Sequence, residues 1–127
     1  STLVLVSSHE VTGLSDAYAT YKRALMVNPH VRVGMVVNRA PTHAAAQAAW
    51  ERFRGASQKF LGSEPELIGF VPADDAVPES VERRVPVVRC APGSAAARAL
   101  TDVASWPPLD LARTSSAFYD RARRALR

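Results

Sequence analysis

Residues 67–88 of the chain read LIGFVPADDAVPESVERRVPVV, and this stretch decides the fold. An apolar run ends at Val71-Pro72, a turn follows at Ala73-Asp74-Asp75, and a charged segment leads to a second apolar run at Pro86. This order predicts a strand, a turn, a short helix and another strand. In an open parallel sheet, the loop that follows a strand lies at the ligand-binding edge. A functional site is therefore expected immediately after Val71.

Two apolar runs earlier in the chain predict buried strands at Thr2–Ser7 and Val31–Asn38. With Glu66–Val71 as the central strand and Pro86–Arg89 as the last, they give a sheet of about four strands. The two early runs are almost continuously apolar, which is typical of strands covered on both faces. Helical patterns separate the runs, so the connections are right-handed βαβ crossovers. The expected fold class is α/β, a mostly parallel sheet with helices on both faces.

The helices are expected to begin and end at recognisable residues. Ser15 caps the first helix and Asn28-Pro29 ends it, a second long helix ends at Gly62 in the left-handed conformation, and Ser94 caps a third. A short helix is expected at Pro78–Arg83. The apolar faces predicted from helical spacing are Leu14, Tyr18, Tyr21 and Leu25; Ala46, Trp50, Phe53 and Phe60; and Ala97, Leu100 and Ala104.

Composition is that of one ordinary globular domain, with 47% hydrophobic and 22% charged residues in 127. The net charge of +4 is concentrated near the end of the chain, so an anionic partner is indicated for the tail only and no nucleic acid partner is expected. The single cysteine, Cys90, favours a reducing compartment because it has no internal disulfide partner. The run Leu3–Val6 is too short for a signal peptide. We therefore expect a cytoplasmic protein.

The residues for holding nucleotide phosphates are missing from the sequence. A P-loop needs a lysine directly after a glycine, and neither Lys22 nor Lys59 follows one. Recognition of a base remains open, because Asn38 offers a donor and an acceptor at one strand end and Pro72 offers a flat apolar surface at the next. Each residue also has an ordinary interpretation, Asn38 as a turn residue and Pro72 as a residue that ends a strand.

Asp74-Asp75 allows two interpretations. The pair could be a metal site or an acid and base, but carboxylates directly before a helix more often serve its N-terminus, and that interpretation is preferred. No metal site is predicted at His9, His30 or His43, because none has cysteines or carboxylates at ligand spacing.

The order of several motifs resembles the C-terminal half of the MinD/ParA-type deviant P-loop ATPases, closest to the MinD-like flagellar-number regulators. The resemblance runs from Thr2 to about Ser105. The stretches that carry it are Leu3-Val4-Leu5-Val6 with Ser7-Ser8-His9-Glu10; Thr12 with Ser15-Asp16-Ala17-Tyr18 and Lys22; Val36-Val37-Asn38-Arg39; Phe60-Leu61-Gly62; Leu67-Ile68-Gly69-Phe70-Val71-Pro72 with Asp74 and Val77; Arg83-Arg84 before Pro86-Val87-Val88; and Pro92 with Ser94, Ala96 and Ala97. His9 departs from the pattern, since the family usually has proline there.

The resemblance implies half of a P-loop NTPase-type fold and half of an ATP site. Residues 1–106 correspond to a partial MinD-like domain without the P-loop half. The family's adenine pocket maps onto Asn38, Arg39, Pro72, Ala73 and Asp74. ATP or ADP would bind only with the missing half, which also carries the Mg²⁺ ligands. Such proteins control the placement or number of a division or flagellar apparatus. The alternative is a truncated or degenerate MinD-like binding module without nucleotide chemistry.

Residues 107–127 are expected to form a proline-containing linker and a basic amphipathic helix. The residues proposed to meet an anionic membrane are Phe118, Arg121, Ala122, Arg124 and Leu126. MinD-like proteins commonly end in such a helix, so a position at the inner membrane is one expectation; a solvated arginine-rich end is the other. The partners expected are a second copy or a separate N-terminal half, and a flagellar regulator or assembly protein.

Overall fold

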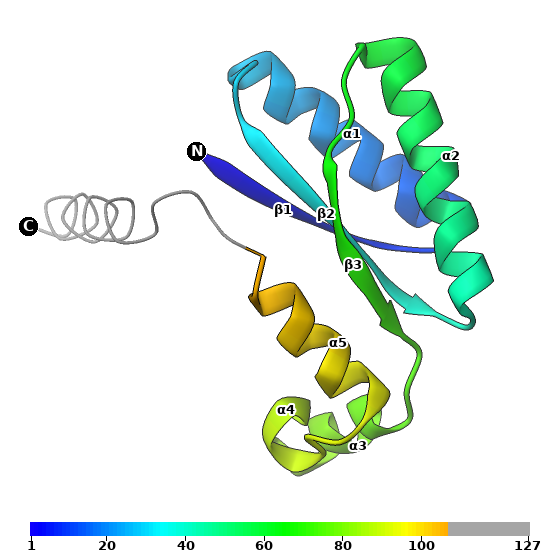
Figure 1. Cartoon of the computed structure of the whole chain (residues 1–127), viewed down its shortest axis with the longest axis vertical. Coiled ribbons are helices and arrows are strands. Elements are labelled where there is room, and N and C mark those ends of the chain that lie inside the picture. Colours follow the sequence, from blue (N-terminus) through cyan, green and yellow to red (C-terminus); the bar gives the residue numbers. More distant parts are fainter. Residues whose placement is uncertain (107–127) are drawn as a thin grey trace, which may run out of the picture.

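A computed structural model of the chain describes residues 1–106. The sheet in this part is parallel and has three strands, β1 (Thr2–Ser8), β2 (Arg32–Ala40) and β3 (Glu66–Pro72), in the order β1-β2-β3. The helices are α1 (Val11–Val27), α2 (His43–Leu61), α3 (Ala76–Arg83), α4 (Val87–Cys90) and α5 (Ala95–Ala104) (Figure 1). The α/β class predicted from the sequence is confirmed.

The sheet has an apolar cluster on each face. On one face, Leu5, Met35 and Val37 pack with residues of α1 and α2, including Tyr21 and Phe53. On the other face, Val36 of β2 and Val71 of β3 pack with Ala96 of α5, with Ile68 and Val103 beside them. Neighbouring residues of a strand point to opposite faces, so Val36 and Val37 serve different clusters.

Helix ends agree with the sequence prediction at three positions and differ at one. Helix α1 ends at Val27 with Asn28 as its C-cap, as predicted. Gly62 ends α2 with φ of 65°, in the left-handed region, and the Ser94 hydroxyl accepts a hydrogen bond from Ala97 N at the start of α5. Helix α1, however, begins at Val11 with Glu10 at its N-cap, so Ser15 is not the cap. Its Gly13 lies against Ser8, where a Cβ atom would collide with the Ser8 hydroxyl. That close approach lets the helix begin so soon after β1.

The predicted strand Pro86–Arg89 is wrong. Residues Val87–Cys90 form the short helix α4, and Pro86 O accepts hydrogen bonds from Arg89 N and Cys90 N, both at 2.9 Å. The pair of β-branched valines suggested a strand, but only Val87 is buried and no strand of the described part pairs with this segment. The sheet therefore has three strands within residues 1–106, and the central one is β2; Glu66–Pro72 lies at its edge.

Three predicted faces also need correction. Phe60 is 68% exposed, because the inward row of α2 continues from Phe53 through Ser57 to Leu61. In α5 the inward residues are Ala96, Ala99 and Val103; Ala97 is buried, but the predicted Leu100 and Ala104 are exposed.

The third correction concerns β1, which was expected to be covered on both faces. Its Val4 and Val6 are exposed, since α5 packs mainly on β3, at the opposite edge of the sheet.

Candidate functional site

The carboxyl ends of β2 and β3 lie side by side and form the base of the site. Asn38 is the register partner of Val71, and Ala40 is the partner of Pro72, with Arg39 between them as a bulge. Ala73 N donates a hydrogen bond to Ala40 O at 2.9 Å, so the two strand ends stay together beyond the bulge. Parallel pairing thus brings Asn38 and Pro72 to the same edge although 33 residues separate them along the chain.

Arg39 has a strained backbone at this edge. Its φ is 60°, and within residues 1–106 the only other non-glycine residue with positive φ is Arg84. A residue with a Cβ atom pays a steric cost in this conformation, and such outliers are concentrated at functional sites. Bulges of this kind redirect a side chain at the end of a strand. Here the bulge places Arg39 in the wall of a pocket.

A pocket of about 300 Å³ lies at this edge, and all five residues of the predicted adenine pocket line it. They are Asn38, Arg39, Pro72, Ala73 and Asp74. Asp75, Val77 and Pro78 complete the wall, because α3 begins directly after the turn. Neither Val77 nor Pro78 was predicted to line a pocket, since Val77 was named only in a resemblance motif and Pro78 only as the start of the expected short helix. The volume is at the low end of the range for small-molecule pockets.

The pocket combines polar and charged side chains with the rings of two prolines. The Asn38 carboxamide makes no hydrogen bond with any residue of the described part, so its oxygen can accept and its nitrogen can donate to a ligand. Pro72 and Pro78 present ring surfaces that form no competing side-chain hydrogen bonds. Such a wall suits a planar ring with a donor and an acceptor on one edge.

Asp74 connects two helices at the floor of the pocket. Its Oδ1 accepts a hydrogen bond from Ala76 N at 2.9 Å and its Oδ2 accepts one from Ala96 N at 3.0 Å. These two backbone donors, Ala96 first and Ala76 second, lower the pKa of the Asp74 carboxyl below its usual value. The carboxylate therefore stabilises the N-terminal turns of α3 and α5 together.

The preferred interpretation of Asp74-Asp75 as residues that serve a helix N-terminus is confirmed for Asp74. Asp75 occupies the N-cap position of α3 but makes no side-chain capping bond. The sequence could not indicate that Asp74 also reaches α5, because Ala96 lies 22 residues further along the chain.

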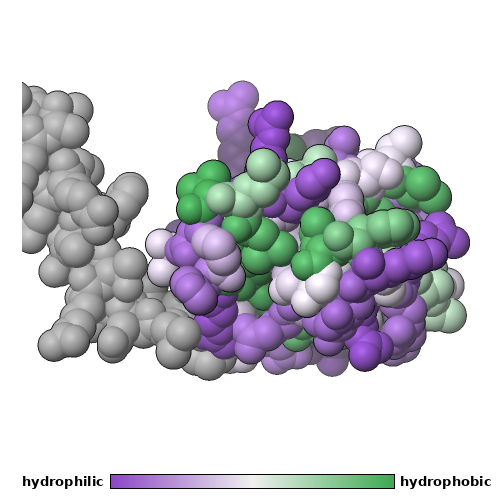
Figure 2. Space-filling view, turned by 90° about the horizontal axis from the view of Figure 1, so that it is seen from above, coloured by the Kyte–Doolittle hydropathy of each residue, from purple (hydrophilic) through white to green (hydrophobic). Residues whose placement is uncertain are grey.

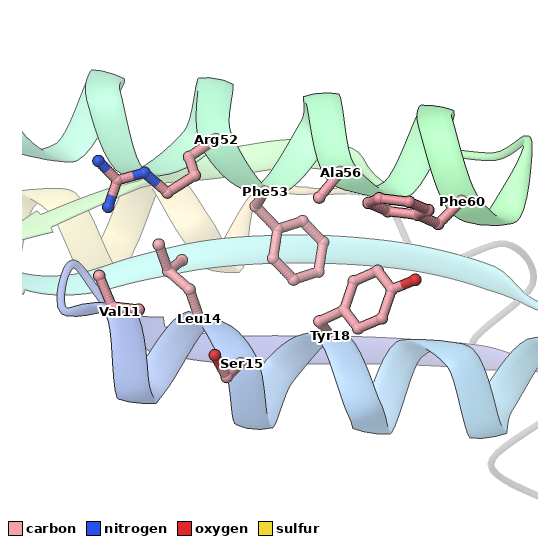
Figure 3. Close-up of a pocket in the computed structure, with 8 residues that line it drawn as sticks. All are labelled: Val11, Leu14, Ser15, Tyr18, Arg52, Phe53, Ala56 and Phe60. Carbon is pink, nitrogen blue, oxygen red and sulfur yellow. The ribbon is translucent and has the colours of Figure 1, made fainter.

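Helices α1 and α2 form a second, apolar hollow of about 280 Å³. Leu14 and Tyr18 of α1 point toward Phe53, Ala56 and Phe60 of α2 across it (Figure 3). Exposed hydrophobic residues also occur where these helices end, including Met26, Val27 and Phe60. Seen from above, the surface of the molecule shows green hydrophobic groups among purple hydrophilic ones (Figure 2). This hollow contains no cluster of polar groups.

No group of three or more His, Cys, Asp or Glu able to hold a metal ion occurs within residues 1–106. None of the helices in this part is long and apolar enough to span a membrane. The residues predicted to meet a membrane surface, namely Phe118, Arg121, Ala122, Arg124 and Leu126, lie outside the described residues.

Comparison with known proteins gives no assignment: no protein-family model matches the sequence, and no curated protein matches it.

Proposed function

We propose that this chain forms the adenine side of a nucleotide site in a MinD-like ATPase, a site that works only when a P-loop half is present. The observation that carries the proposal is the pocket at the carboxyl ends of β2 and β3. It lies where open parallel sheets bind ligands, and it gathers the five residues that the resemblance assigns to base recognition.

Asn38 is the recognition group in this proposal. Adenine presents a donor and an acceptor side by side on its edge, and a carboxamide can pair with both. Arg39 would cover one side of the base, because a guanidinium plane stacks well on aromatic rings. Pro72 and Pro78 would cover the rest through van der Waals contact.

The phosphates need groups that this sequence lacks. No Gly-Lys pair is present, so backbone amides and a lysine cannot surround the β- and γ-phosphates in the manner of a P-loop. Catalysis, the Mg²⁺ ion and the switch from ATP to ADP would come from the other half. Following the resemblance, the complete protein would regulate the placement or number of flagella or of a division apparatus at the cytoplasmic membrane.

A ligand titration followed by NMR tests base recognition separately from catalysis. Adenosine carries only the part of the nucleotide that this half of the site would contact, so it should shift the amide signals of Asn38, Ala73 and Val77, and pyrophosphate alone should not. Asn38→Ala should abolish the shifts, whereas Asn28→Ala, the same change at the end of α1, should leave them unchanged. Equal shifts with guanosine, or shifts that survive Asn38→Ala, would contradict adenine recognition.

A binding module without nucleotide chemistry is the second candidate. The apolar hollow between α1 and α2 favours it, since Phe60 and Val11 are exposed there and surround a surface able to contact a protein. The same titration separates the candidates, because a binding module predicts no adenosine response. If Phe60→Glu then abolished binding to a protein partner, that loss would support the binding module.

A further inference from the structure

The outer edge of β1 has backbone groups that no strand in the described part pairs with. β1 lies at one edge of the sheet, beside β2. Arg32 N, at the start of β2, donates a hydrogen bond to Ser1 O, so the carbonyl of Ser1 points toward β2. Backbone groups alternate in direction along a strand, so the amides and carbonyls of Leu3, Leu5 and Ser7 also point toward β2. Those of Val4 and Val6 point away from the sheet, as do those at each end of the strand. An open edge of this kind pairs readily with another strand.

The side chains along this edge are apolar as well. Val4 is 45% exposed and Val6 is 62% exposed, on the face where their register partners Gly34 and Val36 are buried. Such a surface resembles half of a strand interface rather than an ordinary solvated edge, which would carry lysine, proline or a bulge.

A groove runs beside this edge, between β1 and α1. Two hollows of about 360 Å³ and 420 Å³ adjoin along it and share Leu3 and Thr20. Four of the seven α1 residues that line it are small, namely Gly13, Ala17, Thr20 and Ala24. Small residues leave space for the side chains of an added strand and for a second helix beside α1.

Charges on α1 are arranged for a reversed copy of the same helix. Asp16 lines one hollow and Arg23 lines the other, on the same side of α1. Neither forms an ion pair with another residue of the described part. If two copies of α1 lay antiparallel, Asp16 of each would face Arg23 of the other.

The sequence of β1 is also nearly symmetric about its centre. It reads TLVLVSS, with Leu5 in the middle, Val4 and Val6 on either side, and hydroxyl residues Thr2 and Ser8 at the ends. Reversing the strand about Leu5 sets valine against valine and hydroxyl against hydroxyl, which are favourable cross-strand pairs, while Leu3 lies opposite Ser7.

We propose that the outer edge of β1 binds a second copy of this chain. The two β1 strands pair antiparallel about a two-fold axis at Leu5, with Val4 opposite Val6 of the second copy, and extend the sheet from three strands to six. The small face of α1 packs against its equivalent, with Asp16 opposite Arg23. The nucleotide pocket lies elsewhere, at the ends of β2 and β3.

Sedimentation velocity of the full chain over a wide range of concentration tests this assembly. A reversible dimer is expected, and Val6→Lys should abolish it. Val81→Lys is the matched control, because Val81 is 70% exposed on α3, away from the β1 edge. D16R and R23D should each weaken the dimer, and the double charge reversal should restore it. A dimer insensitive to Val6→Lys, or no rescue by the double reversal, would overturn the proposed geometry.

Hydrogen exchange at single amides gives a second measurement. The Leu3 and Leu5 amides should exchange slowly at every concentration, since they face β2. The Val4 and Val6 amides should become protected only as the dimer forms. Protection of the Val4 and Val6 amides in a monomer would mean that the chain's own segment after Trp106 covers the edge instead. The Trp106 ring lies 4.3 Å from the Arg32 guanidinium, close to the sheet. A monomer with fast exchange at Val4 and Val6 would equally refute the proposal.

Discussion

Replacing Arg39 by glycine should make the protein more stable and the pocket worse. Arg39 has φ of 60° in the bulge after Asn38, where an L-residue pays a steric cost of about 1–2 kcal/mol. Glycine removes that cost but adds about 0.4–1 kcal/mol of unfolded-state entropy. The expected net gain in the free energy of unfolding is about 0.5–1 kcal/mol, which raises the melting temperature by roughly 2–8 °C for a domain of this size.

The same change removes a guanidinium from the pocket wall. The loss of one stacking or hydrogen-bonding contact of about 0.5–1.5 kcal/mol should weaken adenosine binding by roughly 2–10-fold. The chain offers a matched control at Arg84, which has φ of 55° at the C-cap of α3 and does not line the pocket. Arg84→Gly should stabilise the protein by a similar amount and leave adenosine binding unchanged.

Denaturant unfolding and the NMR titration measure the two effects separately. If Arg39→Gly lowered stability while Arg84→Gly raised it, the Arg39 side chain would stabilise the fold and the argument from strain would fail. If Arg39→Gly left adenosine binding unchanged, Arg39 would not belong to the site.

Three other predictions concern the phosphates, the helix junction and the tail. The chain alone should hydrolyse no ATP above background, because it lacks a P-loop, and turnover lost on Asn38→Ala would contradict this. Asp74→Asn should lower the free energy of unfolding at pH 7 much more than Asp75→Asn. The folded-state pKa of Asp74 is lowered, so the stability that its carboxylate contributes is complete above the ordinary pKa of 3.8 and is lost as the pH falls through the folded-state pKa. The stability deficit of Asp74→Asn should therefore shrink in acid. An equal deficit at pH 7 and in acid would refute this prediction. Binding to anionic vesicles should fall with added salt and with Phe118→Glu, and equal sedimentation of a chain ending at Pro108 would exclude a membrane role for the tail.

The candidate pocket was partly predictable because parallel strands have a fixed geometry. Asn38 and Pro72 each end an apolar run, and consecutive strands joined by a helix usually lie side by side with their carboxyl ends at one edge. That rule alone brings the two residues together. The sequence could not indicate the bulge at Arg39, since an arginine in the left-handed conformation has no local signal; the register shift between β2 and β3 imposes it.

Longer-range packing accounts for the predictions that failed. Val87 and Val88 have the composition of a strand, yet the segment has no neighbouring strand within residues 1–106 and forms α4 instead. Phe60 is more hydrophobic than Ser57, but the helical phase set by Phe53 places Ser57 inward and leaves Phe60 exposed. Hydrophobicity along the chain shows which residues could be buried, whereas the position of each element on the sheet selects those that are.

The sequence by itself determined the α/β class, the left-handed end of α2 at Gly62 and the cap of α5 at Ser94, because each follows from periodicity or from the chemistry of one residue and its near neighbours. Only the tertiary structure decided that Asp74 joins α3 to α5, that Val77 and Pro78 complete the pocket, and that no strand within residues 1–106 pairs with the apolar outer edge of β1. These features depend on contacts between segments distant in the chain, and such contacts arise from the packing of whole elements, which no local stretch of sequence specifies.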